Sequence, residues 1–389
     1  MNALAGLSSN ELSNYSQDPV LKAFEQHLVT PQNSSIAQLW NFMYNLIYQA
    51  NAVMEGISNS TTLSTRARQQ LKGEALFMRG FTYFYLVNLF GEVPLVVETD
   101  YRVNKSLPRG SVDEVNSLIE SDLLSAQSLL SLAYATENRV RPNRATATAL
   151  LARLYLYRHE YFKSELQATA IIDDATYSLN TKDNIDKTFL IDSPETIWQL
   201  MPVFSNANTV EGFNFIINTT PRNHILTEAL REHFEPGDLR QTHWINSYTN
   251  TLGVFYFAYK YKQNTKDPAT PVTECSVVFR LAEIYLIRAE ARVYLDNVNG
   301  AQSDLNAIRS RAGLADIDVA DKSNLLLAIE SERWSELFTE YGQRWFDLKR
   351  TDRALDLLGS GITADALLYP IPAVEFVKNP NLGEQNHGY

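Results

Sequence analysis

Apolar side chains recur at intervals of three and four residues over most of the first 175 positions of the chain. This is the period of a helix that buries one face. The clearest run covers residues 36–57, and a second ends at Gly91, with Pro94 beyond it as a stop signal. A third begins with Ser111 and Glu114, the spacing of a capping box. The pattern predicts helices over residues 40–56, 65–90, 112–132, 144–158 and 161–173.

The middle of the chain has a different pattern. Between residues 177 and 273, short apolar runs at 196–203, 213–217 and 254–261 are separated by Asn, Gly, Pro and Thr. Such spacing favours a few short strands and long loops. A tail rich in Pro, Asn and Gly follows at 359–389, where we expect an extended but docked chain. Between the middle and the tail, helical periodicity returns at 277–295, 301–311, 322–341 and 344–358.

One internal repeat supports a helical array. The residues at 152–156, a link of seven residues and the residues at 164–168 recur at 291–295 and 303–307 with the same spacing. In each copy an amphipathic helix turns through a short polar link into a second helix. Tetratricopeptide-like arrays are built from such pairs, each of which buries its apolar face against the next. We therefore expect a mostly α-helical fold, with a tetratricopeptide-like repeat scaffold and an irregular part of loops and short strands.

Composition and charge exclude several classes of protein. The net charge of −11, with no local cluster of Lys or Arg, argues against a nucleic-acid partner. The single cysteine, Cys275, leaves no internal disulfide and no multi-cysteine metal site, and we expect it to be unreactive. No apolar run approaches the roughly 18 residues of a membrane-spanning helix. Residues 1–16 lack the features of a signal peptide, so the chain is either cytoplasmic or begins after its export signal.

Charged residues that invite a catalytic interpretation have a structural alternative. Three glutamates lie one helical turn apart on a single face: Glu332, Glu336 and Glu340. A glycosidase would need two carboxylates about 5–10 Å apart across a sugar ring, and a helix face inside a repeat array offers no such cleft. We therefore favour a polar seam that pairs with Arg333, Arg344 and Arg350. Arg79 and Asp347 are likewise expected to be buried structural ions.

Other signatures of chemistry do not occur in the sequence. The six histidines show no metal-binding spacing, and neither a Gly-x-Ser-x-Gly motif nor a phosphate-binding Gly-rich loop is present. The sequence therefore predicts no catalytic residue, no metal and no cofactor.

The aromatic content favours a binding function. Twenty tyrosines and five tryptophans exceed what a helical core requires. Aromatic rings offer flat surfaces to the C–H faces of sugars, and amide and guanidinium groups bind hydroxyls. Loops of the irregular part can present such groups. The candidate ligand-binding residues there are Arg222, His224, Trp244, Asn246, Tyr248 and Tyr256. Four tyrosines at helical spacing are instead expected in the core: Tyr155, Tyr157, Tyr285 and Tyr294.

Four segments resemble motifs of one family, in the family's order. They are GEALFMRGF at 73–81 with LFGEVPL at 89–95, VFRLAEIYLIRAEA at 278–291, the Glu/Arg-rich stretch at 332–350 with GQRWFDLKR, and the ending at 369–389 with its YPIP and NPNL groups. On these segments the chain is identified as a member of the SusD/RagB family of Bacteroidetes surface lipoproteins. The resemblance extends from Trp40 to the last residue.

The resemblance implies a fold and a role. A single unit over residues 1–389 would carry about four tetratricopeptide-like helix pairs in 36–175 and 276–358, with the ligand-binding part at 176–275. It would capture an oligo- or polysaccharide for a SusC-type TonB-dependent porin in the outer membrane, without catalysis. A lipid anchor on a cysteine upstream of Met1 would hold it there, although no such cysteine stands near Met1. The loops before Trp40 would join the ligand site, adding Asn14 and Tyr15.

Two further functions stay open at this point. The same scaffold could be a peptide-binding or protein-interaction module, since tetratricopeptide grooves hold extended peptides. An exposed aromatic surface would favour sugar, whereas a charged or amide-lined groove would favour peptide. A glycosidase would require two carboxylates facing one cleft.

Overall fold

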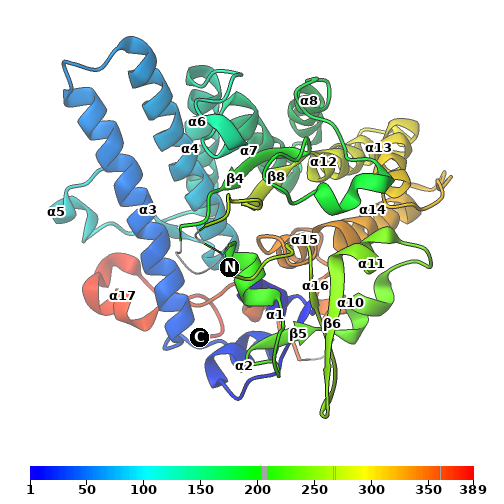
Figure 1. The fold of residues 1–389 in the computed structure, drawn as a ribbon. Coiled ribbons are helices and arrows are strands. Elements are labelled where there is room, and N and C mark those ends of the chain that lie inside the picture. The colour runs from blue at the N-terminus through cyan, green and yellow to red at the C-terminus, as the bar shows by residue number, and fades with distance from the viewer. Residues whose placement is uncertain (204–207, 266, 268, 360) are drawn as a thin grey trace. The chain divides into compact units, whose positions relative to one another are not determined.

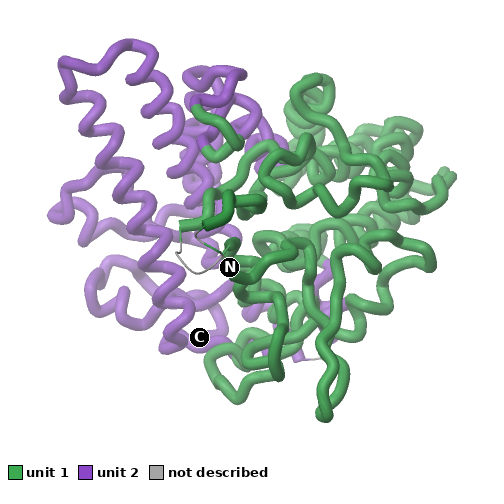
Figure 2. The backbone as a smooth tube through the Cα atoms, viewed as in Figure 1, with its two compact units in different colours: residues 1–25, 136–140, 155–352 green, residues 26–135, 141–154, 353–389 purple. Residues whose placement is uncertain are grey.

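The computed structural model describes residues 1–389 except 204–207, 266, 268 and 360, and confirms a mostly helical fold with short two-stranded sheets (Figure 1). The chain forms two compact units, coloured in Figure 2. Unit 1 comprises Met1–Glu25, Thr136–Val140 and Tyr155–Asp352, and unit 2 comprises Gln26–Ala135, Arg141–Leu154 and Arg353–Tyr389.

Unit 2 is built on three long helices, α3 (Ser34–Asn59), α4 (Thr65–Phe90) and α6 (Val112–Leu129). Helix α4 packs against both of the others. Its approach to the end of α6 depends on Gly73, where a Cβ atom would lie 2.8 Å from the Leu130 side chain. The predicted caps are present: Ser111 and Glu114 form a complete capping box, and Gly91 ends α4 with φ 74°. The Arg79 guanidinium donates two hydrogen bonds, each at 2.7 Å, to the Asp122 carboxylate on α6, as expected for a paired buried ion.

The rest of unit 2 consists of short elements and the C-terminal tail. Strand β2 (Val93–Pro94) pairs with β3 (Arg109–Gly110), and α5 (Tyr101–Asn104) lies between them in the chain. The last segment of unit 2, Arg353–Tyr389, contains α16 (Ala354–Leu357), a 3-10 turn at Asp365–Leu367, α17 (Ala373–Lys378) and a last 3-10 turn at Pro380–Leu382. The Tyr369 N–H donates to the Leu89 carbonyl at 2.7 Å, and Asn386 donates to the Phe90 carbonyl at 2.8 Å. Both bonds use carbonyls that the end of α4 leaves without helical partners.

Unit 1 holds the second helical group. It contains α8 (Tyr161–Ile172), α12 (Leu281–Tyr294), α13 (Val298–Arg311), α14 (Lys322–Leu337) and α15 (Gln343–Arg350). Helix α12 lies against α8, α13 and α14 and is buried on nearly every side. The hydrophobic core around it includes Ala282, Leu286, Leu305, Ile308, Leu325 and Ile329.

The two helix–turn–helix copies have the same turn. Helix α7 (Arg144–Tyr157) begins in unit 2 and ends in unit 1, and both it and α12 are followed two residues later by a left-handed residue, His159 (φ 58°) and Asp296 (φ 65°). In each case the next N–H donates at 2.8 Å to the carbonyl five residues earlier, a Schellman-type ending. The sequence repeat paired residues 152–156 with 291–295, an offset two residues larger than the one that superimposes His159 on Asp296. The similar helical composition of the two segments accounts for that alignment.

Three expected elements differ from the structure. Residues 276–280 form strand β8 (Ser276–Arg280), antiparallel to β4 (Thr196–Leu200), and α12 begins only after it. Residues 213–217, expected as a strand, lie largely in α9 (Val210–Phe215), which starts because the Thr209 hydroxyl accepts from the Gly212 N–H at 2.9 Å. The helix expected at 344–358 is divided after Arg350 by Asp352, whose φ is 56°. The expected strands at 196–203 and 254–261 are present as β4 and β7 (Gly253–Ala258).

Candidate functional site

A short strand ladder joins the N-terminal loop to the irregular segment within unit 1. Strand β1 (Leu12–Asn14) pairs antiparallel with β5 (His224–Leu226), so that Asn14 lies opposite His224. The Tyr15 N–H then donates to the Asn223 carbonyl at 2.8 Å. Four of the predicted ligand residues, two on each side of this ladder, are thereby brought to one place.

The Tyr15 ring is supported by the hairpin of β6 (Ile245–Asn250) and β7. It meets the Phe255 ring edge-to-face at 5.1 Å, and 37% of Tyr15 is exposed whereas Phe255 is buried. Tyr248 lies directly opposite Phe255 across the strands, and so on the same face of the hairpin. The Asn14 side-chain oxygen accepts from the Ser16 N–H at 3.1 Å and from its hydroxyl at 2.8 Å, a turn that fixes the backbone around Tyr15.

A cleft of about 320 Å³ adjoins this ladder. We call it the loop cleft; it is lined by residues 213, 214 and 216–224, and amide and hydroxyl side chains are prominent among them. Arg222 is exposed at the cleft and has no carboxylate partner within the part of the chain that the structure describes. The Asn250 side chain donates to the Thr220 hydroxyl at 3.0 Å and so ties the hairpin to the cleft. His224 is only 7% exposed, and burial lowers its pKa to about 4, so its ring is neutral at neutral pH.

A larger cleft, of about 480 Å³, lies against the hairpin. We call it the hairpin cleft, and its lining includes the predicted residues Asn246 and Tyr256. Its other walls are the short helices α10 (Glu228–His233) and α11 (Leu239–Trp244), which lie close to β6 in Figure 1. The Arg231 guanidinium lies over the Tyr256 ring, 4.3 Å from its centroid.

Trp244 does not belong to either surface, and its expected role as an exposed ring is wrong. The side chain is 0% exposed, and its indole N–H donates to the Ile185 carbonyl at 3.4 Å. It meets the Phe189 ring edge-to-face at 5.4 Å, and the Arg311 guanidinium lies 5.3 Å from its centroid. The ring therefore packs over buried cations. Nothing in the residues flanking Trp244 signals this, because the cations come from distant segments.

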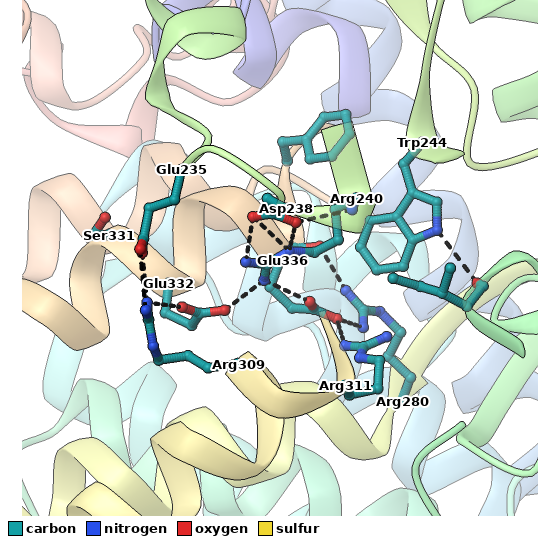
Figure 3. Close-up of polar contacts among 12 residues, drawn as sticks. Glu235, Asp238, Arg240, Trp244, Arg280, Arg309, Arg311, Ser331, Glu332 and Glu336 are labelled. Carbon is teal, nitrogen blue, oxygen red and sulfur yellow. Dashed lines mark hydrogen bonds and ion pairs between the residues drawn. The ribbon is translucent and has the colours of Figure 1, made fainter. Parts of the chain in front are cut away.

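The three helical glutamates take part in a network of ion pairs, and Figure 3 shows Glu332 and Glu336 within it. Glu336 is 0% exposed and accepts from Arg240 at 3.0 Å and also from Arg280 and Arg311. Glu332 accepts from Arg240 at 2.6 Å. The favoured interpretation as a structural seam agrees with this geometry, but two of the expected partners were wrong: Arg333 pairs with Asp347 at 2.7 Å, and Arg350 pairs with Glu290. Glu332 and Glu336, 3% and 0% exposed, cannot flank a sugar, and Glu340 is paired with Arg280 and Lys260.

Comparison with known families gives matches to two parts of the chain. One family model, described as "Starch-binding associating with outer membrane", matches residues 6–156, and another, described as "SusD family", matches residues 227–360. The chain belongs to the SusD/RagB family.

Individual SusD-like proteins resemble the chain over nearly its full length. SusD-like protein P38 of Formosa agariphila is 26% identical over 93% of this chain and 81% of its own. A SusD superfamily protein of Bacteroides vulgatus superimposes with a TM-score of 0.87 at 21% identity, covering 100% of this chain and 93% of that one. A laminarin-binding SusD-like protein superimposes with a TM-score of 0.83 at 22% identity, covering 100% and 94%. These structures establish the shared fold.

An aromatic pair on the repeat helices of this SusD-like chain was missed by sequence reasoning. Tyr294, expected in the core, is 45% exposed and stacks on Tyr161 with centroids 4.0 Å apart and an interplanar angle of 7°. The helical period placed Tyr294 on an apolar face, but α12 ends at this residue and leaves its ring at the turn.

The remaining candidate chemistry is structural. Cys275 is buried with its sulfur 3.7 Å from that of Met201, and burial raises its pKa to about 12. Within the described residues, His, Cys, Asp and Glu form no group that could hold a metal ion. No helix in the described part of the chain is both long and apolar enough to cross a membrane.

Proposed function

We propose that this SusD-like chain binds a carbohydrate at the surface formed by Tyr15, the β1–β5 ladder and the loop cleft, and that it performs no catalysis. One observation carries the proposal: a half-exposed ring held in place by a buried ring lies beside a cleft lined with amides, hydroxyls and a guanidinium. That combination suits a ligand with apolar C–H faces and many hydroxyl groups.

The side chains divide the recognition between them. Tyr15 offers the flat surface, with Tyr248 on the same hairpin face. Arg222 supplies N–H donors that no protein carboxylate occupies within the described residues, and Asn214 and Asn218 line the loop cleft with groups that both donate and accept. His224, neutral and nearly buried, shapes the base of the cleft.

The family supports the same class of ligand and a place in the cell. The model that matches residues 6–156 is described by starch binding and outer-membrane association, and a structural relative binds laminarin. We extend this to a role as a lipoprotein of the outer membrane that delivers oligo- or polysaccharide to a SusC-type TonB-dependent transporter. Co-purification of the native protein with such a transporter from outer membranes tests that step, and a native protein recovered without any membrane protein would contradict it.

Binding is tested by isothermal titration calorimetry with laminarihexaose, maltohexaose and an uncharged hexapeptide. Tyr15→Ala should weaken sugar binding by roughly 1–3 kcal/mol, the cost of removing a central contact ring. Tyr101→Ala is the matched control, because Tyr101 is 71% exposed on α5 in unit 2. Equal sugar affinity in the wild type and Tyr15→Ala would refute the site. Binding of the peptide alone, lost in Tyr15→Ala, would favour the peptide-binding alternative that the amide-lined cleft permits.

The absence of catalysis has its own test. Incubation of the protein with laminarin or starch should release no reducing ends above a buffer control. Hydrolysis that persists through purification would contradict the proposal.

A further inference from the structure

The hairpin cleft is separate from the surface around Tyr15. Ser247 and Tyr256 lie opposite each other across β6 and β7. Along β7, Tyr256 lies between Phe255 and Phe257, which are both buried. Because successive strand residues point to opposite faces, the Tyr256 ring faces away from the side on which Tyr15 contacts Phe255. Its ring lines a cleft of about 480 Å³, a volume typical of small-molecule sites.

Both helical walls of the hairpin cleft are anchored in the core. In α10, Leu230 is 0% exposed and the His233 ring lies against Trp334 with centroids 4.2 Å apart. In α11, Arg240 is buried and pairs with Asp238 at 2.8 Å, and Trp244 ends the helix inside the core. The cleft is therefore preformed, and a ligand need not order it on binding.

The polar groups of the hairpin cleft are placed to bind hydroxyls. Among the described residues, the ion-pair partner of Arg231 is Glu228, which is 75% exposed and 3.8 Å away. This distance is too long for a hydrogen bond, so the guanidinium N–H groups stay available to a ligand. The Gln241 side-chain nitrogen donates to the Arg231 carbonyl at 3.0 Å, which fixes the amide and leaves its oxygen as an acceptor. Glu232 contributes a carboxylate to the lining, and Ser247 a hydroxyl.

We infer that the hairpin cleft is a second carbohydrate site, which takes a neutral pyranose unit against the Tyr256 ring beside the Arg231 guanidinium, with its hydroxyls on Arg231, Glu232 and Gln241. The inference rests on the proposed carbohydrate binding and adds a second contact to it. A neutral unit fits because the cation and the carboxylate in the lining balance each other. With two sites on opposite faces of one hairpin, a long glycan can be held twice, and its apparent affinity exceeds that of either site.

The test compares short and long ligands on the full chain. Calorimetry with laminarihexaose and maltohexaose counts the sites, and affinity electrophoresis with laminarin and starch measures binding to the polymers. The variants are Tyr15→Ala, Tyr256→Ala and Arg231→Gln, with Tyr101→Ala as control, and circular dichroism verifies that each is folded. We expect two hexasaccharides per wild-type chain and one in either Tyr15→Ala or Tyr256→Ala. Polymer binding should fall at least about tenfold in Tyr256→Ala and Arg231→Gln.

Each result decides between the two proposals. One hexasaccharide per wild-type chain, lost in Tyr15→Ala and unchanged in Tyr256→Ala and Arg231→Gln, overturns the second site and leaves the first. Binding lost only in Tyr256→Ala keeps the hairpin cleft and refutes the surface around Tyr15. Failure of all four ligands to bind the wild type overturns both.

Discussion

Replacing Glu336 by glutamine removes one charge from the centre of the buried network in Figure 3. The carboxylate is 0% exposed and accepts from Arg240, Arg280 and Arg311. A glutamine keeps the shape but offers a single acceptor oxygen, and its NH₂ group faces guanidinium N–H groups that also donate.

The magnitude follows from what each arginine retains. Arg240 keeps Asp238 at 2.8 Å, and Arg280 keeps Glu340 at 2.8 Å. Arg311 is left with Glu195 at 3.4 Å as its nearest carboxylate among those the structure shows. One buried cation thus loses its close partner, and breaking a buried pair in this way costs about 3–5 kcal/mol. We expect Glu336→Gln to lower the free energy of unfolding of unit 1 by that amount.

Urea unfolding followed by tryptophan fluorescence measures this change, because four of the five tryptophans lie in unit 1 and only Trp40 lies in unit 2. The matched control is Glu228→Gln, which removes an exposed carboxylate 3.8 Å from Arg231 and should cost at most about 1 kcal/mol. If the two variants unfold at the same urea concentration, the network does not stabilise the fold as argued.

The effect of pH gives a second check on Glu336. Burial favours its neutral form, but the three arginines outweigh burial and hold its pKa well below the ordinary value. A lowered pKa in the folded state means that the carboxylate stabilises the protein above the unfolded-state pKa and that this contribution is lost as the pH falls. The difference between wild type and Glu336→Gln should therefore be full at pH 7 and shrink below about pH 4. A difference that grows in acid would contradict this assignment.

Three further outcomes are expected. Burial raises the pKa of Glu11 to about 7, so the stability that its neutral form contributes is present in acid and lost as the pH rises toward 7. In urea titrations, Glu11→Gln should therefore be as stable as wild type at pH 4 and more stable by roughly 3 kcal/mol at pH 8. A difference in stability that does not change with pH would refute this. Trp244→Ala should lower the free energy of unfolding by about 3–5 kcal/mol while leaving sugar affinity at Tyr15 unchanged, and the reverse result would restore Trp244 as a ligand residue. Cys275, buried and with its pKa raised to about 12, should react with a disulfide reagent at pH 8 only after unfolding in urea, and rapid reaction of the native protein would contradict its burial.

The helical part of the fold could be predicted from the sequence because each helix carries its own signals. The period of the apolar residues, the cap at Ser111 and the stop at Gly91 are all local. Where a strand depends on a distant partner, local signals failed. The apolar residues of β8 continue directly into α12, and only the pairing with β4 separates strand from helix.

The candidate site was predictable to a lesser extent. The position of Tyr15 and Tyr256 outside the repeat helices predicted that their rings are partly exposed, which the structure shows, and their role as ligand residues stays a prediction. The same criterion failed for Trp244, whose surroundings are supplied by Arg280, Arg311 and other distant residues. A sequence shows which rings lie in loops, but which of them meet solvent depends on contacts far along the chain.

The buried charges explain how an irregular segment can present a defined surface. Lys260, just after β7, donates to the Glu336 and Phe338 carbonyls at 2.9 and 2.8 Å, and so serves carbonyls that the end of α14 leaves unpaired. Arg240 fastens α11 to the same helix through Glu332. The hairpin and the short helices are thus held at their bases by ions that belong to the repeat scaffold. Their tips contribute little to the core, so ligand-contacting residues there can change without loss of the fold, whereas Arg240 and Lys260 cannot.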